Sequence, residues 1–397
     1  MITYIVRRTL QSLAFILFMW LLVYTVLVML MPRGPKDRFE HFNGFDFRGE
    51  MTADELRLVY KLDKPWPVNF FLWLFDPNDT SKQDPNKTDN RLRKGIDVNL
   101  LGLHLQGSGA LTGNFGISER VLAGREVGEA IADRWSNTMW LVGVSLIVAI
   151  LVAVPLGIIA AMKYRSALDH MITFLSFAGF SIPPYAFGVI LIIMLAVVPY
   201  YMHTFDGQTW VPYLPPGDVA SIGQRENPVN RVYHLVLPVV TLALPQIAYL
   251  SRHMRFAMLE ILRLEYIRTA WAKGLPGRRV MFKHAFRNAL IPLFTAIGLM
   301  IPLLISGAIL VETVFAYPGL GQLFFRAVGG CLAPPEAYER LCSPFEGTPG
   351  ALLPMDYTLA LGLTVLMVVV VAFANVIADV LYTFADPRIN YSHKSQA

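Results

Sequence analysis

One polar, basic stretch holds most of the side chains with which this chain could bind a partner. It runs from Glu265 to Pro292 (EYIRTAWAKGLPGRRVMFKHAFRNALIP), and apolar runs long enough to cross a membrane border it on both sides. Good helix formers fill its first part, until Gly274, Pro276 and Gly277 turn the chain. A second helical segment starts near Arg278. We therefore expect a short helix, a sharp turn and a return into the membrane, which together make a protruding cytosolic element that another protein can push.

Motifs for nucleotide binding or metal-dependent hydrolysis are missing from the sequence. Neither GxxxxGK[ST] nor HExxH occurs, and Gly-Lys is absent as a dipeptide. The eight histidines are scattered, and His170, His253 and His284 fall near the expected cytosolic interface, where a structural role is the favoured interpretation. We expect no catalytic residue, bound cofactor or metal site in this chain.

The elements that must position the basic stretch are membrane-spanning helices. The chain has 397 residues, of which 54% are hydrophobic and 16% charged, whereas about a quarter of the residues in a soluble domain are charged. Six apolar segments reach the roughly 20 residues that a spanning helix needs: about 9–31, 137–162, 171–199, 233–251, 289–315 and 356–381. The composition predicts an all-α membrane protein with six transmembrane helices.

The first apolar run is interpreted as a retained helix rather than a cleaved signal peptide. It follows Arg7 and Arg8 and lacks a small-residue cleavage site. The expected organisation is a first transmembrane helix in 1–32, an extracytoplasmic region 33–135, a five-helix core 136–384 with a cytosolic loop 252–288 and an extracytoplasmic loop 317–355, and a cytosolic tail 385–397.

Basic residues indicate which loops face the cytosol. The loop 252–288 carries nine basic residues against two acidic ones, and the short turn after the second span carries Lys163 and Arg165. By contrast, the region 33–135 has 15 basic and 16 acidic residues. Because cytosolic loops carry the excess of lysine and arginine, both termini and the loop 252–288 are expected in the cytosol of a multi-pass protein of the cell membrane. The net charge of +5 thus reflects the excess of basic residues in the cytosolic loops and does not indicate nucleic-acid binding.

The region 33–135 contains three features with different expectations. The segment 76–108 is expected to be a flexible insertion, because its first part, 76–95, is polar and nearly charge-balanced. Segment 51–75 is expected to be a short helix with four aromatic rings: Trp66, Phe70, Phe71 and Trp73. The favoured interpretation is that these rings rest at the membrane interface, and the alternative is that they line a ligand site. The amphipathic segment 124–135 is expected to lie along the outer interface before the second span.

Two cysteines, too few for a disulfide framework or a zinc site, occur in the sequence. Cys331 and Cys342 both fall in the loop 317–355, which is expected outside the cytosol. In an oxidising compartment a disulfide between them is favoured, and two unpaired thiols are the alternative.

Ionisable side chains are absent from the middle of the six predicted spans. Glu312, Asp356 and Asp379 lie at or near span ends. Because ion-coupled and proton-coupled transporters need ionisable groups within the membrane, a transporter without them must draw its energy from another subunit. This indicates a passive transport path whose conformation is changed by a subunit outside the membrane.

Prolines and glycines mark places where the spans change direction. Pro238 and Pro245 interrupt the fourth span, which we interpret as kinked and buried in a bundle. Pro183 and Pro184 either break the third span beside the transport path or only kink it. The turn 317–321 is expected to end the fifth span and start a short helix, its glycines serving geometry rather than chemistry.

The basic stretch resembles the cytosolic "EAA" loop of ABC-transporter permeases, in the branch that imports dipeptides, oligopeptides and nickel. The resemblance rests on YxRTAxAKG followed by HAxRNAxxP, here Tyr266, Arg268, Thr269, Ala270, Ala272, Lys273 and Gly274, then His284, Ala285, Arg287, Asn288, Ala289 and Pro292. Further matching phrases occur in order along most of the chain, from YIVRR through SIPPYAFG, HLVLPVVTLALP and LVETVFAYPGLGQL to ADPRINY. Trp271 departs from the branch, which commonly has arginine there, and 76–108 and about 330–350 look like insertions.

The resemblance implies a type I ABC importer permease fold, which is MetI-like. It implies that a coupling helix made by Glu265, Tyr266, Arg268, Thr269, Ala270, Ala272, Lys273 and Gly274 sits in a groove of an ATPase subunit. Small residues at 270, 272 and 274 would let that partner approach closely, and Gly274 would end the helix with a positive φ. Further implied partners are a homologous second permease, a second ATPase and an extracytoplasmic solute-binding protein, with ATP and Mg²⁺ held by the ATPases and lipid around the spans.

Three alternatives stay open from the sequence. The coupling segment could be a basic amphipathic helix lying on anionic lipid. The chain could be a secondary transporter or channel, which the uncharged spans disfavour, or a membrane scaffold that recruits a cytosolic protein without transport. Peptides are the leading solutes, with nickel, sugars or opines as alternatives, because members of the family change cargo without changing these motifs.

Overall fold

The computed structural model describes residues 2–30, 98–100, 103–105, 125–205, 214–329 and 356–385, together with single residues at 68, 70, 71, 74, 110, 115, 116, 118, 121 and 122. Its contacts divide the chain into two compact units. Unit 1 comprises 1–13, 136–322 and 370–397, and unit 2 comprises 14–135 and 323–369. Cys331, Cys342 and the tail 386–397 lie outside the described residues, so the disulfide prediction stays a prediction.

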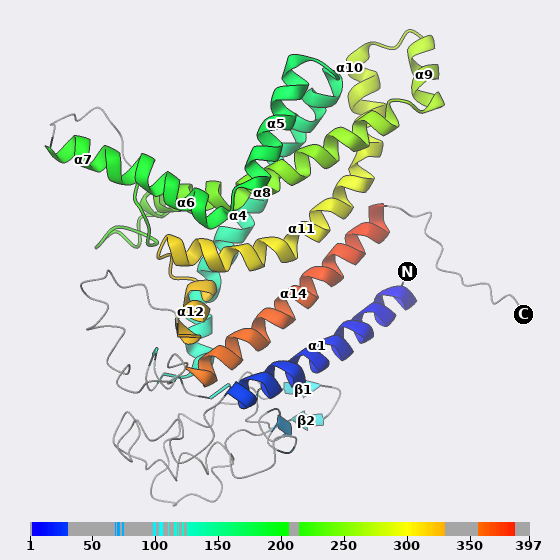
Figure 1. Ribbon diagram of the computed structural model, residues 1–397. Helices are drawn as coiled ribbons and strands as arrows, with labels where there is room; N and C mark the ends of the chain where they lie inside the picture. The colour runs from blue at the N-terminus through cyan, green and yellow to red at the C-terminus, as the bar shows by residue number, and fades with distance from the viewer. Residues whose placement is uncertain are drawn as a thin grey trace, which may run out of the picture. The chain divides into compact units, whose positions relative to one another are not determined.

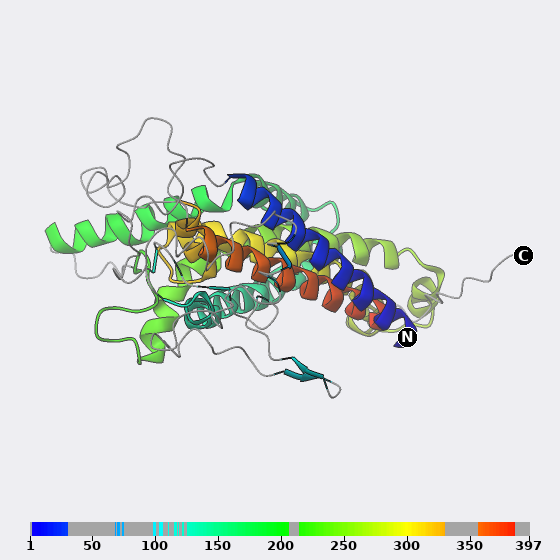
Figure 2. The ribbon, with the colours of Figure 1, turned by 90° about the horizontal axis from the view of Figure 1, so that it is seen from below.

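Helices make up almost all of the regular structure in the described ranges (Figure 1). Two short strands, Val98–Leu100 (β1) and Leu103–Leu105 (β2), form an antiparallel hairpin (Figure 2) within the expected insertion 76–108. The helices are α1 (Ile2–Leu30), α4 (Val127–Met162), α5 (Ala167–Ser181), α6 (Pro184–Ile192), the π-helix η5 (Ile193–Val197), α7 (Val198–Phe205), α8 (Pro228–Ile261), α9 (Glu265–Ala272), α10 (Gly277–Arg279), the π-helix η6 (Val280–Phe286), α11 (Arg287–Val314), α12 (Leu320–Ala327) and α14 (Tyr357–Ala385).

Six helical runs in the described part of the chain are long and apolar enough to cross a membrane, which agrees with the six predicted spans. They are Arg7–Val26, Val127–Met162, Pro184–Met202, Pro228–Ile261, Gly277–Val314 and Tyr357–Val380. More than half of the most apolar window of α8 is buried, the largest share among the six. The prediction that this proline-bearing span is buried is therefore confirmed for the larger part of that window, while its predicted kink stays a prediction.

Of the two alternatives left open for the predicted third span, 171–199, the structure shows the break. α5 ends at Ser181, Ile182 and Pro183 are extended, and α6 starts with Pro184 at its first turn. A residue that precedes proline is pushed out of the helical region, and proline itself fits the first helical position because it has no N–H to satisfy. The Pro183–Pro184 pair therefore breaks the helix rather than kinking it, and the candidate span begins at Pro184.

The amphipathic segment 124–135, expected along the outer interface before the second span, is joined to that span in one helix from Val127 onward. α4 runs without interruption from Val127 to Met162. No glycine or proline occurs from Glu129 to Val142 to stop a helix there, so the amphipathic beginning continues into the apolar run.

Unit 1 is built around an apolar core to which several helices contribute. Its buried members come from α4, α8, α9, η6 and α11, and include Ile158, Met254, Met258, Ile267, Val280 and Leu293. α4 approaches α8 closely at Gly157, where an added Cβ would lie 2.6 Å from both Met254 Cβ and the Ser251 carbonyl oxygen. Only glycine allows this approach, so the two helices are in backbone contact near one end of unit 1.

Unit 2 has its own core, in which α1 packs against α14. Trp20 Nε1 donates to the Val365 carbonyl at 3.3 Å, and the Tyr24 and Phe70 rings meet edge to face with centroids 5.3 Å apart. Phe70 is buried there, whereas Phe71 is exposed, and the expected place of these rings at the membrane interface stays a prediction. Trp66 and Trp73 lie outside the described residues.

Candidate functional site

The sequence-predicted coupling helix is α9, which follows α8 after a three-residue turn at 262–264. Leu264 is extended, and the helix covers Glu265–Ala272. In Figure 1, α9 and α10 stand together beyond the ends of α8 and α11. The expected arrangement of short helix, turn and return is thus observed, because Gly277–Val314 forms one continuous helical run after the turn.

Gly274 ends α9 in the way that the sequence predicts. Its φ is +70°, a conformation that L side chains rarely adopt. Its N–H donates to the Trp271 carbonyl at 2.9 Å, and the Leu275 N–H donates to the Ala270 carbonyl at 3.4 Å. These two bonds form a Schellman motif around the C-cap residue Lys273. The end of the helix is therefore set by local backbone chemistry.

One face of α9 is buried and fixes the helix to unit 1. Ile267 is 0% and Ala270 is 8% exposed, and both belong to the same core as Val280 and Met281. The expectation that a small residue at 270 admits a partner is therefore wrong, because Ala270 packs inward. Its small size instead allows the helix to lie close to the core.

The opposite face of α9 is exposed, and we call it the α9 surface. It consists of Glu265, Tyr266, Arg268, Thr269, Trp271, Ala272, Lys273 and Gly274. Arg268 Nη1 contacts Glu265 Oε1 at 2.7 Å, and Thr269 Oγ1 donates to the Glu265 carbonyl at 3.0 Å. The structure thus presents every predicted coupling residue except Ala270 on one solvent-facing side.

Two side chains outside the predicted site hold this surface in place. Asn288 Nδ2 donates to Tyr266 Oη at 2.9 Å and to the His284 carbonyl at 2.8 Å. The Trp271 ring covers Gly277, where an added Cβ would lie 3.2 Å from it. From the sequence, Asn288 was matched to a motif without an assigned role, and Trp271 was noted only as a departure from the branch. Both contacts join residues on different helices, so the local sequence did not reveal them.

The other predicted positions are separated from the α9 surface. Pro183 is exposed and Pro184 half-buried at the break between α5 and α6, while Pro238 is buried and Pro245 half-buried within α8. Within the described ranges, no group of three or more histidine, cysteine or acidic side chains is arranged to hold a metal ion. Pro183 and Pro184 mark a break between helices, whereas Pro238 and Pro245 lie inside the continuous α8, and none of the four belongs to the α9 surface.

A second cluster of hydrogen-bonded polar groups in unit 1 lies at the end of α11. Glu312 is fully buried and accepts hydrogen bonds from Thr138 Oγ1 at 2.6 Å and from the N–H groups of Gly321 and Gln322 at 2.6 and 3.1 Å. The carboxylate therefore caps the first turn of α12. An added Cβ at Gly319 would overlap that carboxylate, so the predicted geometric role of the glycines in this turn is confirmed.

Tyr317 lies next to this acid and is buried as well. Its burial, with a smaller effect of the Glu312 charge, raises the pKa of Tyr317 to about 12. The Tyr317 N–H donates to the Glu312 carbonyl at 2.8 Å. The turn after α11 is thus buried and hydrogen-bonded to the end of that helix.

Comparison with known proteins gives the family directly. The model of the family described as "Binding-protein-dependent transport system inner membrane component" matches residues 153–391, which is more than half of the chain. The chain is 39% identical to the oligopeptide transport system permease protein AppB of Bacillus subtilis, over 70% of this chain and 77% of that protein. It is 32% identical to the dipeptide transport system permease protein DppB of Escherichia coli, over 71% and 78% of the two chains.

A third relative matches almost end to end. A putative peptide permease protein of Brucella suis is 29% identical over 389 residues, 98% of this chain and 99% of that protein. The segments that look like insertions therefore have counterparts in at least one relative of matching length. With six apolar helices and a family match over most of its core, the chain belongs to the binding-protein-dependent transport system inner membrane components and is a multi-pass permease subunit of an ABC importer.

Proposed function

We propose that this permease forms half of a peptide path and is driven through the α9 surface by two cytosolic ATPase subunits. The observation that carries the proposal is the two-sided nature of α9. Its buried face is part of the core that also contains the ends of α4, α8 and α11, while its other face is exposed and charged. A force applied to the exposed face therefore reaches the ends of three long helices through packed side chains.

The charges of the loop support a cytosolic position for α9. The nine basic residues of 252–288 fit the positive-inside rule, which would also place both termini in the cytosol. ATP and Mg²⁺ would be bound by the ATPases, and this chain would supply no catalytic residue and no cofactor site. Closing of the ATPases on ATP would draw two α9 helices together, one from each permease, and would switch the path between its inward and outward orientations.

Peptides are the proposed solute because the relatives are named for peptide, oligopeptide and dipeptide transport. A homologous second permease would complete the path. An extracytoplasmic solute-binding protein would deliver the peptide, and the region 33–135 is the proposed place of its contact. These partners are characteristic of importers that depend on a binding protein, the class to which the family description refers.

Affinity purification from native membranes tests the proposal. Tagged full-length chain is solubilised in mild detergent, and copurifying proteins are identified by mass spectrometry. Recovery of a second permease and of ATPases is the expected result, followed by MgATP-dependent uptake of labelled di- and oligopeptides by the complex in liposomes. Recovery of the chain alone would overturn the coupling proposal in favour of a self-contained channel, and an ATPase complex that moves no solute would favour a scaffold.

A further inference from the structure

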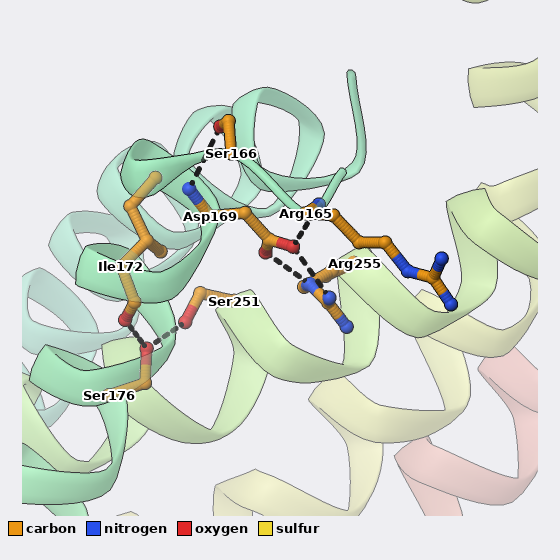
Figure 3. A network of polar contacts seen from close by, with 7 residues as sticks. All are labelled: Arg165, Ser166, Asp169, Ile172, Ser176, Ser251 and Arg255. Carbon is orange, nitrogen blue, oxygen red and sulfur yellow. Dashed lines mark hydrogen bonds and ion pairs between the residues drawn. The ribbon is translucent and has the colours of Figure 1, made fainter. Parts of the chain in front are cut away.

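An ion pair between a buried aspartate and a half-buried arginine joins α5 to α8 close to the predicted coupling loop (Figure 3). Arg255 Nε contacts Asp169 Oδ1 at 2.6 Å, and Arg255 Nη2 contacts Asp169 Oδ2 at 2.8 Å. Asp169 is only 1% exposed. The two parallel hydrogen bonds fix the relative orientation of the groups as well as their separation.

Several neighbouring groups hold this pair in its geometry. The Arg165 N–H donates to Asp169 Oδ2 at 3.0 Å, and Ser166 caps α5 by accepting from the Asp169 N–H at 3.4 Å. The Arg255 guanidinium lies 5.6 Å from the centre of the Tyr164 ring. The hydrogen bonds from Arg255 lower the pKa of Asp169 despite its burial, so the carboxylate stays ionised at neutral pH.

The ion pair is the first of a series of contacts along an antiparallel α5–α8 seam. Ser176 Oγ and Ser251 Oγ are 3.1 Å apart. Further along, an added Cβ at Gly179 would lie 3.4 Å from Leu244 and 3.7 Å from Ala248. The two helices are therefore in contact from the start of α5 nearly to its end.

This seam matters because α5 contributes no member to the apolar core of unit 1. The buried residues of that core come from other helices, and the outward side chains of α5 are well exposed, with Phe174 at 70%. The ion pair and the Ser176–Ser251 contact therefore add directional interactions to the packing of α5 on α8.

The positions of its two ends place α5 between the coupling loop and the break before α6. Arg255 lies six residues before the end of α8 at Ile261, and α9 begins at Glu265. At its other end, α5 leads through Ile182 and Pro183 to α6, the start of a membrane span. A displacement of α8 that α5 follows would therefore reach this break.

We propose that Asp169 and Arg255 are positioning residues for coupling, which fasten α5 to the coupling end of α8 so that the two helices move as one body when α9 is pushed. The inference rests on the proposed function, since it needs a partner that moves α9. It adds a specific transmission route, α9 to α8 to α5 to the Pro183–Pro184 break.

Cross-linking of the seam tests this route without a known solute. Ser176 and Ser251 are both replaced by cysteine in a full-length chain that also carries Cys331→Ser and Cys342→Ser, and the purified complex with its ATPases is oxidised with and without MgATP plus orthovanadate. We expect the same cross-linking rate in both states, and MgATP hydrolysis by the cross-linked complex equal to that of the reduced one. Slower cross-linking in the vanadate-trapped state, or hydrolysis that stops on cross-linking and recovers on reduction, would show sliding helices and overturn the inference.

The ion pair itself is tested in the same cysteine background. With Asp169→Asn, cross-linking in the vanadate-trapped state should fall about tenfold, a factor typical of a lost coupling interaction. The exchanged pair Asp169→Arg with Arg255→Asp should restore the rate, and the exposed Asp133→Asn should leave it unchanged. If Asp169→Asn does not assemble, Arg255→Lys, which keeps the charge but loses the second hydrogen bond, is used in its place.

The outcomes separate this inference from the proposed function. A parent complex without ATPases, or without vanadate-sensitive hydrolysis, would refute both. A parent complex that hydrolyses MgATP normally, while the Asp169 or Arg255 variants cross-link like the parent in both states, would refute only the role of the ion pair.

Discussion

Asn288, at the start of α11, donates a hydrogen bond to the Tyr266 hydroxyl on the α9 surface at 2.9 Å. The two residues are 22 positions apart in the chain, and both belong to the stretch that resembles the "EAA" loop of permeases. The bond closes the loop that leaves α8 and returns as α11. It therefore helps to keep the α9 surface in a fixed orientation relative to α11.

Tyr266→Phe removes the acceptor of this bond and nothing else from the surface. Because a single exposed hydrogen bond contributes about 1 kcal/mol, we expect a severalfold loss of MgATP-driven uptake with an unchanged amount of inserted protein. Uptake by the reconstituted complex is the measurement, and Tyr185→Phe, an exposed tyrosine on α6, is the control. Equal effects of the two changes would contradict the assignment.

Two substitutions at Gly274 distinguish the effect of backbone strain from the effect of a lost partner contact. Gly274→Ala forces a side chain into a left-handed conformation at a cost of about 1–2 kcal/mol, and Gly274→Asp adds bulk and charge to the α9 surface. We expect the alanine variant to be partly active and the aspartate variant to insert normally but to lose ATPase binding, as measured by copurification. Gly223→Ala is the matched control, since Gly223 has φ +78° and open space around it. Normal ATPase recovery with Gly274→Asp would refute the docking role.

Glu312 should be critical for stability rather than for coupling. Glu312→Ala leaves the donors of Thr138, Gly321 and Gln322 without their buried acceptor, and hydrogen bonds to a charged group contribute about 1.5–3 kcal/mol each. We expect a much lower thermal unfolding temperature in detergent, a smaller loss with Glu312→Gln, and a comparable loss with Gly319→Ala. The exposed Glu129→Gln is the control. An unchanged unfolding temperature for Glu312→Ala would contradict the observed cap.

The Asp169–Arg255 pair predicts a pH dependence with a definite sign. Because the folded state lowers the pKa of Asp169, its stabilising contribution is present above the unfolded value of about 3.9. That contribution is lost as the pH falls through the lower folded value. The difference in unfolding temperature between the parent and Asp169→Asn should therefore be largest near neutral pH and should shrink in strong acid. A difference that grows on acidification would contradict the ionised pair.

Local features of this protein were predictable from the sequence. The six apolar runs, the helix at 265–272 and its end at Gly274 were all predicted, because span length, helix propensity and a positive φ depend on neighbouring residues. The break before Pro184 was left as one of two alternatives, and the continuity of α4 through Trp135 was missed. In both cases a boundary was decided by one or two residues within otherwise helical sequence.

Which residues face each other was decided only by the tertiary structure. Hydropathy and motif spacing gave no reason to place Ala270 inside, since a small residue suits a buried face and a docking face equally well. Asp169 and Arg255 are 86 positions apart, and Thr138 and Glu312 are 174 apart. Contacts at such separations arise from the way whole helices pack, because only packing brings two distant polar groups together and removes both from water. The sequence alone thus determined the apolar helices and the short helix at 265–272, and the folded chain determined which of their side chains meet.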